Sequence, residues 1–471
     1  MKAAGTRIFI NATVAYCPTC QEAEQAKIIA GPEGVFLERV CPVKGAAGVK
    51  LAADYNWYLE RVNVPRPLKS PKEGRKMEKG CPLDCGICEC HAGSFCLPIF
   101  SITNDCNLDC PICFTYNRPD QKYYKSVADT QKIIAHIVNQ TGGVPLLNLT
   151  GGEPTLHPEL FSILAACQHE KIGRVTMNTN GLRLAAEREF AVKIKEAGVQ
   201  LVLSLDTFDP HKSVIIHGQD ISGAKRKALQ VIEELAIPVT LLAVCIKGVN
   251  EADVAQIVSE YIKKPFVRSI TIQNMAFTGR NGSKFTPREH ITIDEVEKLL
   301  SGKPDFDSSH FFALGSYHPL CYSAAYYLVH AGRMLPLSKL IAREKLSQFT
   351  QGNYLLNPGA DFSQHFLDGI NKLWAEGEDE AFISALREFI TELYPAGKPL
   401  TAARRLEVAE KMLKMVYIHA HMDDDNFDLG RVSLCGDLVP DETGRMIPAC
   451  SYNLFYRQQD ARFWLETAKE V

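Results

Sequence analysis

The chain has 471 residues, of which 46% are hydrophobic and 23% are charged, and its formal net charge is -3. This balance excludes a general electrostatic footprint for nucleic acid, and we expect no nucleic-acid partner. No run of about 18 uncharged apolar residues occurs, so membrane contact is expected only at the periphery, at the inner membrane face. The length predicts more than one domain, and the first ten residues, MKAAGTRIFI, lack the apolar segment of a secretion signal.

Cysteine is the one residue type whose number is unusual, with 16 in the chain. Without a secretion signal, thiols at this density favour metal ligation in a reducing, cytoplasmic compartment over a disulfide framework. Cys167 and Cys245 stand alone inside apolar elements, where cysteines are usually small core residues, and no role is assigned to either. The other cysteines stand in short motifs or loop-like settings, and these motifs organise the chain.

Residues 1–63 are predicted to form a small N-terminal metal-binding domain. Cys17 and Cys20 stand two apart around a proline, and Cys41 follows in a Cys-Pro pair. Knuckles of this kind hold zinc or a single iron tetrahedrally, and no fourth cysteine is close in sequence. We interpret the site as structural, because the segment is too small to bury a core of its own; electron transfer is the alternative.

The second unit, residues 64–96, combines a linker with a second group of cysteines. Val64–Lys76 is basic and rich in proline, which is typical of a linker. The cysteines that follow begin with CPLDCGIC and are too dense for core packing. They predict an auxiliary iron-sulfur cluster or metal site, with the ligands Cys81, Cys85, Cys88, Cys90 and Cys96.

A third group of cysteines, in the segment CNLDCPICF, repeats the spacing of the second. Cys106, Cys110 and Cys113 follow an apolar run that predicts a strand, and three such thiolates can hold three corners of one iron-sulfur cube. The fourth iron then has no cysteine and can take a small chelating molecule such as S-adenosylmethionine (SAM), whose radical chemistry belongs to the cofactor. A zinc site, the alternative, takes four ligands and leaves no vacancy.

Between residues 97 and 290, short apolar runs alternate with helical patterns. Six β-α units of this kind predict an α/β fold, a partial (β/α)6 barrel with its functional groups at the C-terminal strand ends. The expected strands are Leu97–Thr103, Val144–Thr150, Arg174–Thr179, Val199–Asp206, Pro238–Cys245 and Val267–Gln273. The expected helices are Val127–Gln140, Pro158–His169, Leu184–Ala197, Gly223–Leu235 and Glu251–Ile262.

Glycines and polar residues follow these strands. Gly151 and Gly152 let the backbone approach a ligand closely, and the carboxylate of Glu153 can hold an amino group; a plain turn is the alternative. The later strands end in polar residues suited to the ribose, carboxylate or adenine of SAM or to substrate, although Asn and Asp also cap helices: Asn178, Asn180, Asp206, Lys247 and Gln273.

Residues 291–471 are predicted to form a mostly helical C-terminal domain. One helix is expected over Thr401–Ile418, whose apolar residues recur at heptad spacing and predict a core stripe. His419, His421 and the acidic run 423–425 are of metal-ligating types, but a solvated helix end is the favoured interpretation.

Three cysteines of this C-terminal part stand in loop-like settings far apart in sequence. We expect them to converge on one further cluster, with one iron open or held by another residue type; three unrelated core cysteines is the alternative. They are Cys321, Cys435 and Cys450.

The segments CNLDCPICF, LTGGEPT, NTNG, KGVN, TGR and PACSYNLFYR resemble the radical SAM superfamily. They are most similar to its multi-cluster group that includes archaeal tetraether lipid synthases, some of whose relatives are described as pterin methylases. The resemblance covers almost the whole chain. Two departures concern Val43-Lys44-Gly45, where the family commonly has His-Gly, and Leu205-Asp206-Thr207, where it often has Phe-Asp-Gly.

The resemblance implies SAM, one SAM-binding 4Fe-4S cluster, two auxiliary 4Fe-4S clusters and one rubredoxin-like mononuclear iron or zinc. The cysteine count agrees if one member of the second group completes the N-terminal four-thiolate site, and Cys81 is the expected donor. The three thiols of the third group are then the catalytic ones, and the C-terminal domain, residues 291–471, carries an auxiliary cluster.

The resemblance also implies that reductive cleavage of SAM gives a 5'-deoxyadenosyl radical, which abstracts hydrogen from an unactivated carbon. Carbon-carbon bond formation between membrane-lipid alkyl chains is expected, in a long apolar cavity that includes the aromatic stretch Phe311–Leu328. Radical methylation or alkylation of a pterin-like heterocycle in a polar slot is one alternative. An iron-sulfur electron-transfer or maturation protein is another. An external reductant such as ferredoxin or flavodoxin is the expected electron source.

Overall fold

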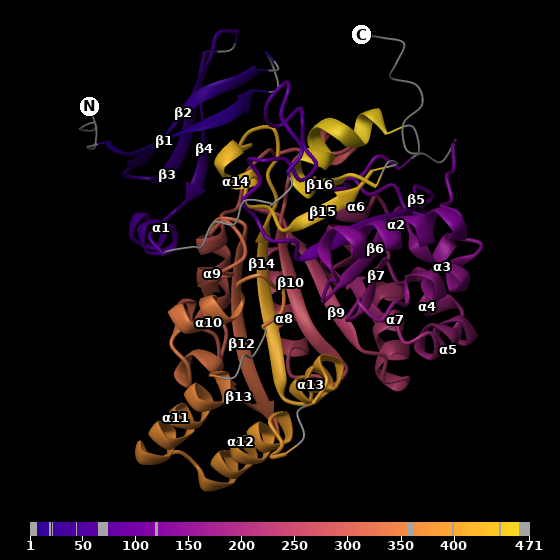
Figure 1. Ribbon diagram of the computed structural model, residues 1–471, viewed down its shortest axis with the longest axis vertical. Coiled ribbons are helices and arrows are strands. Elements are labelled where there is room, and N and C mark those ends of the chain that lie inside the picture. The colour runs from indigo at the N-terminus through magenta and orange to yellow at the C-terminus, as the bar shows by residue number, and fades with distance from the viewer. Residues whose placement is uncertain are drawn as a thin grey trace.

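The computed structural model describes residues 7–17, 20, 22–43, 45–64, 74–117, 121–356, 361–397, 400–441 and 444–460. Most of the expected linker, residues 65–73, lies outside this described part. The elements form a small N-terminal sheet, a large mixed sheet with helices on its outer face, and a group of C-terminal helices (Figure 1).

The N-terminal unit is a four-stranded antiparallel sheet followed by one helix. Apolar residues alternate along its strands, as the pleat requires; Ala26, Ile28 and Ala30 are buried on one face of the second strand. The strands pair in chain order and the helix closes the unit: β1 (Ile8–Cys17), β2 (Glu22–Gly31), β3 (Gly34–Cys41), β4 (Gly45–Ala52) and α1 (Tyr55–Val62).

The six expected barrel strands are confirmed, and they pair parallel to one another in chain order. Their apolar side chains form one continuous core with the surrounding helices. The strands are β5 (Leu97–Thr103), β6 (Leu147–Gly151), β7 (Val175–Thr179), β8 (Gln200–Ser204), β9 (Val239–Cys245) and β10 (Val267–Asn274). The first four helices are α2 (Val127–Thr141), α3 (Leu160–Cys167), α4 (Leu182–Ala186) and α5 (Arg188–Glu196), followed by α6 (Pro210–His217), α7 (Ser222–Glu234) and α8 (Glu251–Tyr261).

Two features of the barrel helices differ from the sequence expectation. The single helix expected over Leu184–Ala197 is divided between α4 and α5, because Glu187 adopts an extended backbone conformation. Helix α6 was not expected. It begins with Asp209 as N-cap and Pro210 in its first turn, a combination that marks a helix start.

C-terminal strands extend the barrel sheet at both edges, to 12 strands. β14 (Leu413–Ala420) lies parallel to β10, β12 (Tyr322–His330) lies antiparallel to β14, and β15 (Asp437–Pro440) lies parallel to β5. The short strands β11 (Phe312–Ala313), β13 (Arg333–Pro336) and β16 (Met446–Pro448) complete the sheet. Among the described strands no pairing joins β11 to β16, so the sheet stays open, as a partial barrel requires.

The expectation of one helix over Thr401–Ile418 is wrong for its second half. Helix α13 (Ala402–Ala409) is followed by β14, whose sequence, LKMVYIHA, is rich in β-branched and aromatic residues. The other C-terminal helices are α9 (Ile293–Ser301), α10 (Arg343–Phe349), α11 (Phe362–Ala375), α12 (Glu380–Leu393), α14 (Leu429–Val432) and α15 (Ala449–Ser451).

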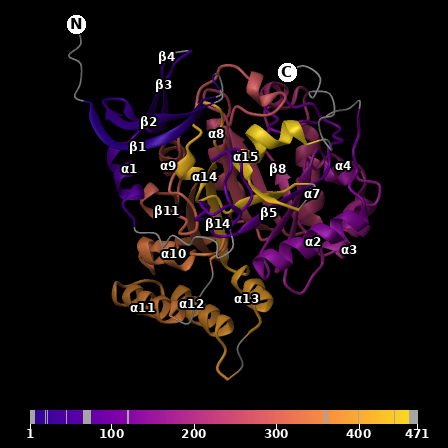
Figure 2. The ribbon, with the colours of Figure 1, turned by 45° about the horizontal axis from the view of Figure 1, so that its top comes forward.

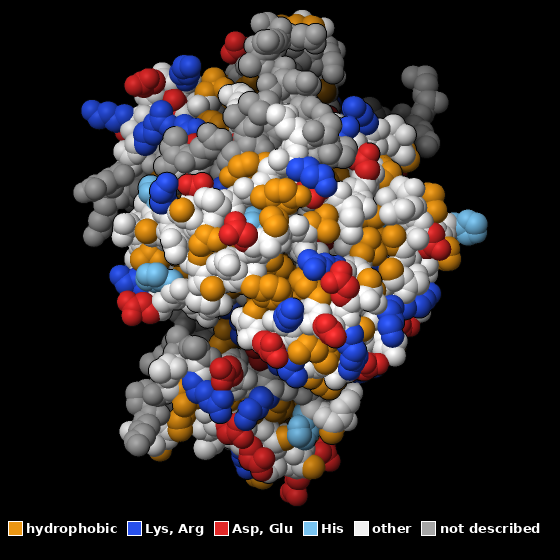
Figure 3. Space-filling model, turned by 90° about the vertical axis from the view of Figure 1, so that its right-hand side faces the viewer, with side chains coloured by type: hydrophobic (Ala, Val, Ile, Leu, Met, Phe, Trp, Pro, Cys, Tyr) orange, Lys and Arg blue, Asp and Glu red, His pale blue; other side chains and the backbone are white. Residues whose placement is uncertain are grey.

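Three of the C-terminal helices lie at one end of the molecule. Helices α11, α12 and α13 lie together there, away from α2 and α3 (Figure 2). On the face shown in Figure 3, basic and acidic side chains are interspersed with small apolar patches. No helix in the described part of the chain has the length and hydropathy needed to cross a membrane.

Candidate active site

The loop after β5 brings the three cysteines of CNLDCPICF to one cavity at the C-terminal ends of the barrel strands. Cys106, Cys110 and Cys113 line this cavity, whose volume is about 190 Å³. Among the described residues no fourth cysteine lines it. Burial raises the pKa of the Cys106 thiol to about 12, so that ionisation here is expected only with a cation bound. Three thiols in one cavity fit a cluster with one open iron.

A second segment, residues 279–282, packs against this cysteine loop. Backbone N–H groups of Arg280 and Gly282 donate to the carbonyls of Thr115 and Cys113 at 3.1 and 2.9 Å. Gly279 has φ +85°, and a Cβ on it would lie 2.3 Å from the carbonyl carbon of Phe114. The TGR motif therefore supports the loop through its backbone, although Arg280 also lines the cavity.

The two glycines of LTGGEPT serve a similar close approach. A Cβ on Gly151 would lie 2.1 Å from the carbonyl oxygen of Thr103, and one on Gly152 would lie 2.1 Å from that of Asp105. Both residues line the cavity. The glycines are thus required where this turn packs against the backbone just before Cys106.

The carboxylate of Glu153 is buried at the cavity wall and joins two strand ends. Its Oε1 accepts hydrogen bonds from Thr155 and from the hydroxyl of Thr179 at 2.8 Å, and its Oε2 accepts one from the backbone N–H of Asn180 at 2.6 Å. The Asn180 amide in turn donates to Asn107 Oδ1 in the cysteine loop at 2.7 Å. This network holds the cysteine loop, the glycine turn and the end of β7 in register.

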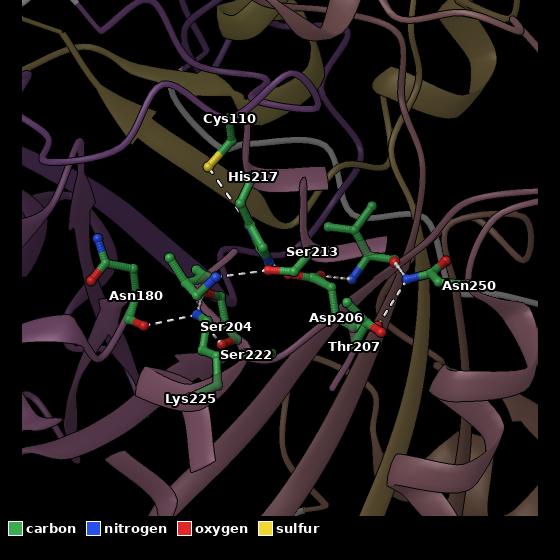
Figure 4. A network of polar contacts seen from close by, with 12 residues as sticks. Cys110, Asn180, Ser204, Asp206, Thr207, Ser213, His217, Ser222, Lys225 and Asn250 are labelled. Carbon is green, nitrogen blue, oxygen red and sulfur yellow. Dashed lines mark hydrogen bonds and ion pairs between the residues drawn. The ribbon is translucent and has the colours of Figure 1, made fainter. Parts of the chain in front are cut away.

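Asp206 is buried beside the cavity, near His217 and Lys225, two residues that the sequence did not single out (Figure 4). Its Oδ1 accepts from the backbone N–H of Val244 at 2.7 Å, and its Oδ2 lies 3.5 Å from His217 Nε2. His217 Nδ1 lies 3.8 Å from Cys110 Sγ. A chain of polar contacts therefore runs from the tip of β8 to a cluster thiol.

Lys225 is a fully buried amine under the same strand tips. Its Nζ donates to the carbonyls of Asn180 and Ser204 at 2.7 and 2.6 Å, and to the Ser204 hydroxyl at 3.0 Å. Burial lowers the pKa of Lys225, and the nearby carboxylate of Asp206 opposes this shift. His217 lies in α6 and Lys225 in α7. The Asp-Pro pair that starts α6 could have predicted the helix that carries His217, whereas no sequence pattern indicated a role for Lys225.

The cavity therefore contains most of the residues expected to bind SAM. Lys247 is the exception: it does not line the cavity, and its Nζ lies 2.8 Å from Glu295 Oε1. Asn180 also accepts from the backbone N–H of Leu182 at 3.0 Å, so it has the local capping role that was the alternative. The expected residues that do line the cavity are Gly151, Gly152, Glu153, Asn178, Asn180, Asp206 and Gln273.

A second cavity, here called the lower chamber, adjoins the first inside the barrel. Its volume is about 130 Å³, and it shares Phe114, Thr150, Asn178 and Gln273 with the first. Amides and hydroxyls from successive strands line it: Asn148, Thr176, Gln200, Thr240, Ser269 and Thr271. The barrel interior below the cysteine loop thus carries a layer of polar side chains, beside apolar residues such as Leu97, Ile99 and Leu146 that line the same chamber.

The cysteines of the second group divide between two places. Four of them, Cys81, Cys85, Cys88 and Cys90, line one cavity of about 410 Å³. Cys96 does not line it; this fully buried thiol lies near Ser316 and Tyr317, which lower its raised pKa. A four-thiolate set at Cys81–Cys90 fits a fully ligated cluster, and the structure gives no support for Cys96 as one of its ligands.

The three C-terminal cysteines are brought together. Burial raises the pKa of Cys435 most, followed by the charge of Asp437, and the thiols of Cys450 and Cys321 raise it further. The pKa of Cys450 is raised by burial and also by Cys321. Arg431 Nε donates to Cys321 Sγ at 3.5 Å, and His421 Nδ1 lies 3.8 Å from Cys450 Sγ. Their arrangement fits a third cluster with a non-cysteine neighbour.

The interpretation of residues 419–425 as a solvated helix end is wrong. His419 is the seventh residue of β14 and stacks on Tyr322, with 3.8 Å between ring centroids. Asp423 is fully buried, and accepts from the backbone N–H of Phe277 at 2.8 Å and from His290 Nε2 at 2.9 Å. The sheet, rather than a helix, carries these residues inward.

The N-terminal cysteines also meet. Sulfur atoms of Cys17, Cys20 and Cys41 and a carboxylate oxygen of Glu24 all lie within 4.8 Å of one another. Cys81, the expected fourth ligand, is not in this group and lies with Cys85, Cys88 and Cys90.

Comparison with known proteins agrees with this geometry. Residues 100–260 match the radical SAM superfamily. The chain contains a radical SAM domain. Over 95% of its length, and 94% of the relative's, it is 24% identical to a Methanocaldococcus jannaschii protein named 7,8-dihydro-6-hydroxymethylpterin dimethyltransferase. A probable GTP 3',8-cyclase of Pyrococcus horikoshii is 30% identical over 33% of the chain, which spans about half, 48%, of that relative.

Solved structures similar to part of this chain include Streptococcus suis SuiB bound to S-adenosylmethionine. The match has 21% identity and a TM-score of 0.35, and covers 44% of this chain and 47% of that one. The FeFe-hydrogenase maturase HydG of Carboxydothermus hydrogenoformans matches with 17% identity and a TM-score of 0.34, over 44% of this chain and 50% of that one.

The radical SAM domain implies a 4Fe-4S cluster and SAM, and the residues present fit both. Cys106, Cys110 and Cys113 supply three thiols to one cavity that has space for a further ligand beside them. The amides of Asn178 and Asn180 and the carboxylate of Asp206 line the same cavity, as the polar parts of SAM require. The chain is therefore an enzyme of radical SAM type, which binds SAM and an iron-sulfur cluster.

Proposed function

We propose that this enzyme modifies a carbon of a small polar nitrogen heterocycle, of the pterin class, held in the lower chamber. The observation that carries the proposal is the polar lining of that chamber. The amides and hydroxyls of this lining bond one another, and an alkyl chain would leave their remaining donor and acceptor capacity unused, whereas a heterocycle with N–H and C=O groups can use it.

Hydrogen bonds between strands show how this lining is organised. Asn148 Nδ2 donates to Thr176 Oγ1 and to Asn178 Oδ1, both at 2.9 Å. Gln200 Nε2 donates to Thr240 Oγ1 at 2.9 Å, and Thr240 Oγ1 lies 2.8 Å from Ser269 Oγ. These side chains form a pre-organised polar layer. A bound heterocycle can replace some of these side chain-to-side chain hydrogen bonds with bonds to its own N–H and C=O groups.

A buried carboxylate at the wall of the same chamber supports a substrate with N–H donors. Asp437 is 2% exposed and accepts from the hydroxyls of Tyr317 and Tyr322 at 2.8 and 2.7 Å. It lines the lower chamber together with Tyr322 and His419. Adjacent ring nitrogens and amino groups of a pterin are suitable partners for its remaining acceptor capacity.

The names of the relatives support the same substrate class. One relative is named for a pterin and the other for GTP, and both molecules contain a fused nitrogen heterocycle. The pterin relative matches almost the whole chain, including the part that contributes Asp437. This agreement favours the heterocycle alternative of the sequence analysis over lipid coupling.

A bound cluster and SAM, with one electron from an external reductant, would supply a 5'-deoxyadenosyl radical, which becomes 5'-deoxyadenosine when it takes a hydrogen atom from the substrate. The chain's own residues bind and position the reactants. Asn178 and Gln273 border both cavities and can contact both reactants. Phe114 lies at the same boundary.

A second candidate, the coupling of lipid alkyl chains, is favoured by a separate apolar chamber of about 270 Å³. It lies between α11, α12, α13 and β14, and its apolar lining includes Leu356, Phe362, Phe366, Phe389 and Leu406. It shares Leu355 and Met415 with the lower chamber. The stretch Phe311–Leu328, where we expected such a cavity, instead forms strands, and its Tyr322 lines the polar chamber.

In the test, the enzyme is reconstituted anaerobically and incubated with SAM, a low-potential reductant and one of three substrates. The substrates are 7,8-dihydro-6-hydroxymethylpterin, GTP and a glycerolipid with long alkyl chains. We expect 5'-deoxyadenosine formation stimulated by the pterin, and a mass change in the pterin. The Cys106→Ala variant should form no 5'-deoxyadenosine and bind about four fewer iron atoms per chain. The core variant Cys167→Ala is the matched control and should behave as the wild type.

Two further variants separate the candidates. Thr240→Val changes the lower chamber, where its hydrogen-bond partners are Gln200 and Ser269, and should remove the stimulation by pterin while slow uncoupled cleavage of SAM continues. Leu356→Gln changes the apolar chamber alone and should leave pterin turnover intact. A product from the glycerolipid but none from the pterin, lost in Leu356→Gln, would establish the lipid candidate. Absence of 5'-deoxyadenosine from the wild type would favour an electron-transfer or maturation role.

A further inference from the structure

The N-terminal cysteines lie at one end of the small sheet, where three strands end or begin. Cys17 is the last residue of β1, Cys41 is the last residue of β3, and Glu24 is near the start of β2. In the β2–β3 register Ala26 lies opposite Arg39, which directs Glu24, two residues earlier, toward Cys41, two residues later. Strand pairing thus brings a carboxylate into the group of thiols.

The side chains form a compact set with one unused oxygen. Cys20 Sγ donates to Glu24 Oε1 at 3.1 Å, and the ligand atoms of all four residues lie within 4.8 Å of one another. Glu24 Oε2 is buried and has no hydrogen-bond partner among the described residues. A buried carboxylate oxygen without a donor is costly unless a cation is bound beside it.

The geometry points to a zinc site with three thiolates and one carboxylate as ligands: Cys17, Cys20, Cys41 and Glu24. Zinc takes sulfur and carboxylate oxygen in the same tetrahedral shell, whereas an iron-sulfur cluster is held by thiolates. With Glu24 as the fourth ligand, no thiol is borrowed from the second group, and Cys81 stays with the three others that line its cavity.

The position of this site gives it a structural consequence. β1 contacts the segment before α14: Tyr16 N donates to the carbonyl of Phe427 at 3.2 Å, and Thr13 Oγ1 donates to Asp428 Oδ1 at 3.1 Å. Tyr16 and Cys450 belong to one buried apolar cluster. A zinc ion that joins the ends of β1, β2 and β3 would therefore hold the N-terminal sheet against the part of the chain that carries the C-terminal thiols.

The test is zinc K-edge X-ray absorption on the full-length reconstituted protein, because this measurement detects zinc alone among several iron clusters. We expect about one zinc per chain, with three sulfur ligands near 2.3 Å and one oxygen near 2.0 Å. Glu24→Gln should weaken zinc binding at least about tenfold in chelator competition. The control Cys81→Ala should leave the zinc spectrum unchanged.

A second variant distinguishes loss of a zinc ligand from misfolding of the N-terminal sheet. Glu24→Cys should retain zinc and change the shell from three sulfurs and one oxygen to four sulfurs. Four sulfurs in the wild type, with one lost in Cys81→Ala, would overturn the assignment. So would a protein without zinc that holds a single iron at this site, or a Glu24→Cys spectrum identical to that of the wild type.

Discussion

Gly279 packs against the cysteine loop at a place where no side chain fits. Its φ is +85°, and a Cβ would lie only 2.3 Å from the Phe114 carbonyl carbon, which leaves no space for a side chain. Gly248 offers a comparison, because its φ is +73° but nothing lies within 4 Å of the place that a Cβ would take. The two positions share backbone strain and differ in available space.

We predict that Gly279→Ala displaces the loop that carries Cys113 and reduces cluster assembly. Iron bound per chain after reconstitution should fall by about four atoms, with loss of SAM binding. Gly248→Ala should cost only about 1 kcal/mol of backbone strain and keep its iron. Measured iron content and SAM binding that are equal in the two variants would contradict this role for Gly279.

Residue types predicted much of the site, but not its internal contacts. The thiols and the polar groups at strand ends were identifiable because cluster ligation and barrel topology restrict where they occur. The hydrogen bonds of Glu153 to Thr179 and Asn180 were not, since they join segments whose separation depends on strand pairing. Lys247 shows the opposite case: it follows a barrel strand but forms an ion pair with Glu295 instead of lining the cavity.

At the scale of elements, β14 joins the C-terminal part to the barrel. It pairs with β10 on one side and β12 on the other. Lys414, its second residue, is 3% exposed and its Nζ donates to the carbonyl of Val267 at 2.5 Å. Burial, aided by the charge of Arg268, lowers the pKa of this lysine from 10.5 to about 8.

This shift predicts a pH dependence of stability. Between pH 8 and 10.5 the unfolded state binds more protons at Lys414 than the folded state, so the free energy of unfolding rises with pH across that window. The full effect is about 3 kcal/mol. The unfolding midpoint of the wild type should therefore rise relative to that of Lys414→Met from pH 8 to pH 10, measured by circular dichroism. Lys132→Met, at an exposed lysine, should show no such change; a constant difference for Lys414→Met would contradict the prediction.

At the scale of the whole molecule, one buried ion pair connects the N-terminal unit to the rest. Arg61 of α1 donates to Glu297 Oε1 of α9 at 2.6 Å, and the two side chains are 5% and 1% exposed. Trp57 Nε1 donates to Glu297 Oε2 at 2.7 Å, and Ser323 Oγ donates to Glu297 Oε1 at 2.5 Å. Burial raises the pKa of Glu297, and Arg61 opposes this shift.

We predict that Arg61→Met destabilises the protein by about 3–5 kcal/mol, because it leaves a buried carboxylate without its counter-charge. Adding Glu297→Gln should recover a large part of the loss, since the neutral amide can accept from Trp57 through its oxygen and donate to the Ser323 hydroxyl through its nitrogen. Denaturant unfolding of the four forms gives the coupling energy. Arg188→Met, in an exposed pair with Glu234, should cost less than about 1 kcal/mol. Additive effects of the Arg61 and Glu297 changes would contradict the coupling.

The sequence by itself determined the parts of this protein that depend on local spacing. Three closely spaced thiols after β5 indicated a cluster, and alternating apolar runs predicted six parallel strands, because both signals lie within single segments. Only the tertiary structure decided which distant groups meet. It placed Glu24 among the N-terminal thiols, made residues 413–420 a strand of the sheet, and brought amides and hydroxyls of successive strands together inside the barrel. These outcomes depend on strand register and on long-range packing, which no single segment contains.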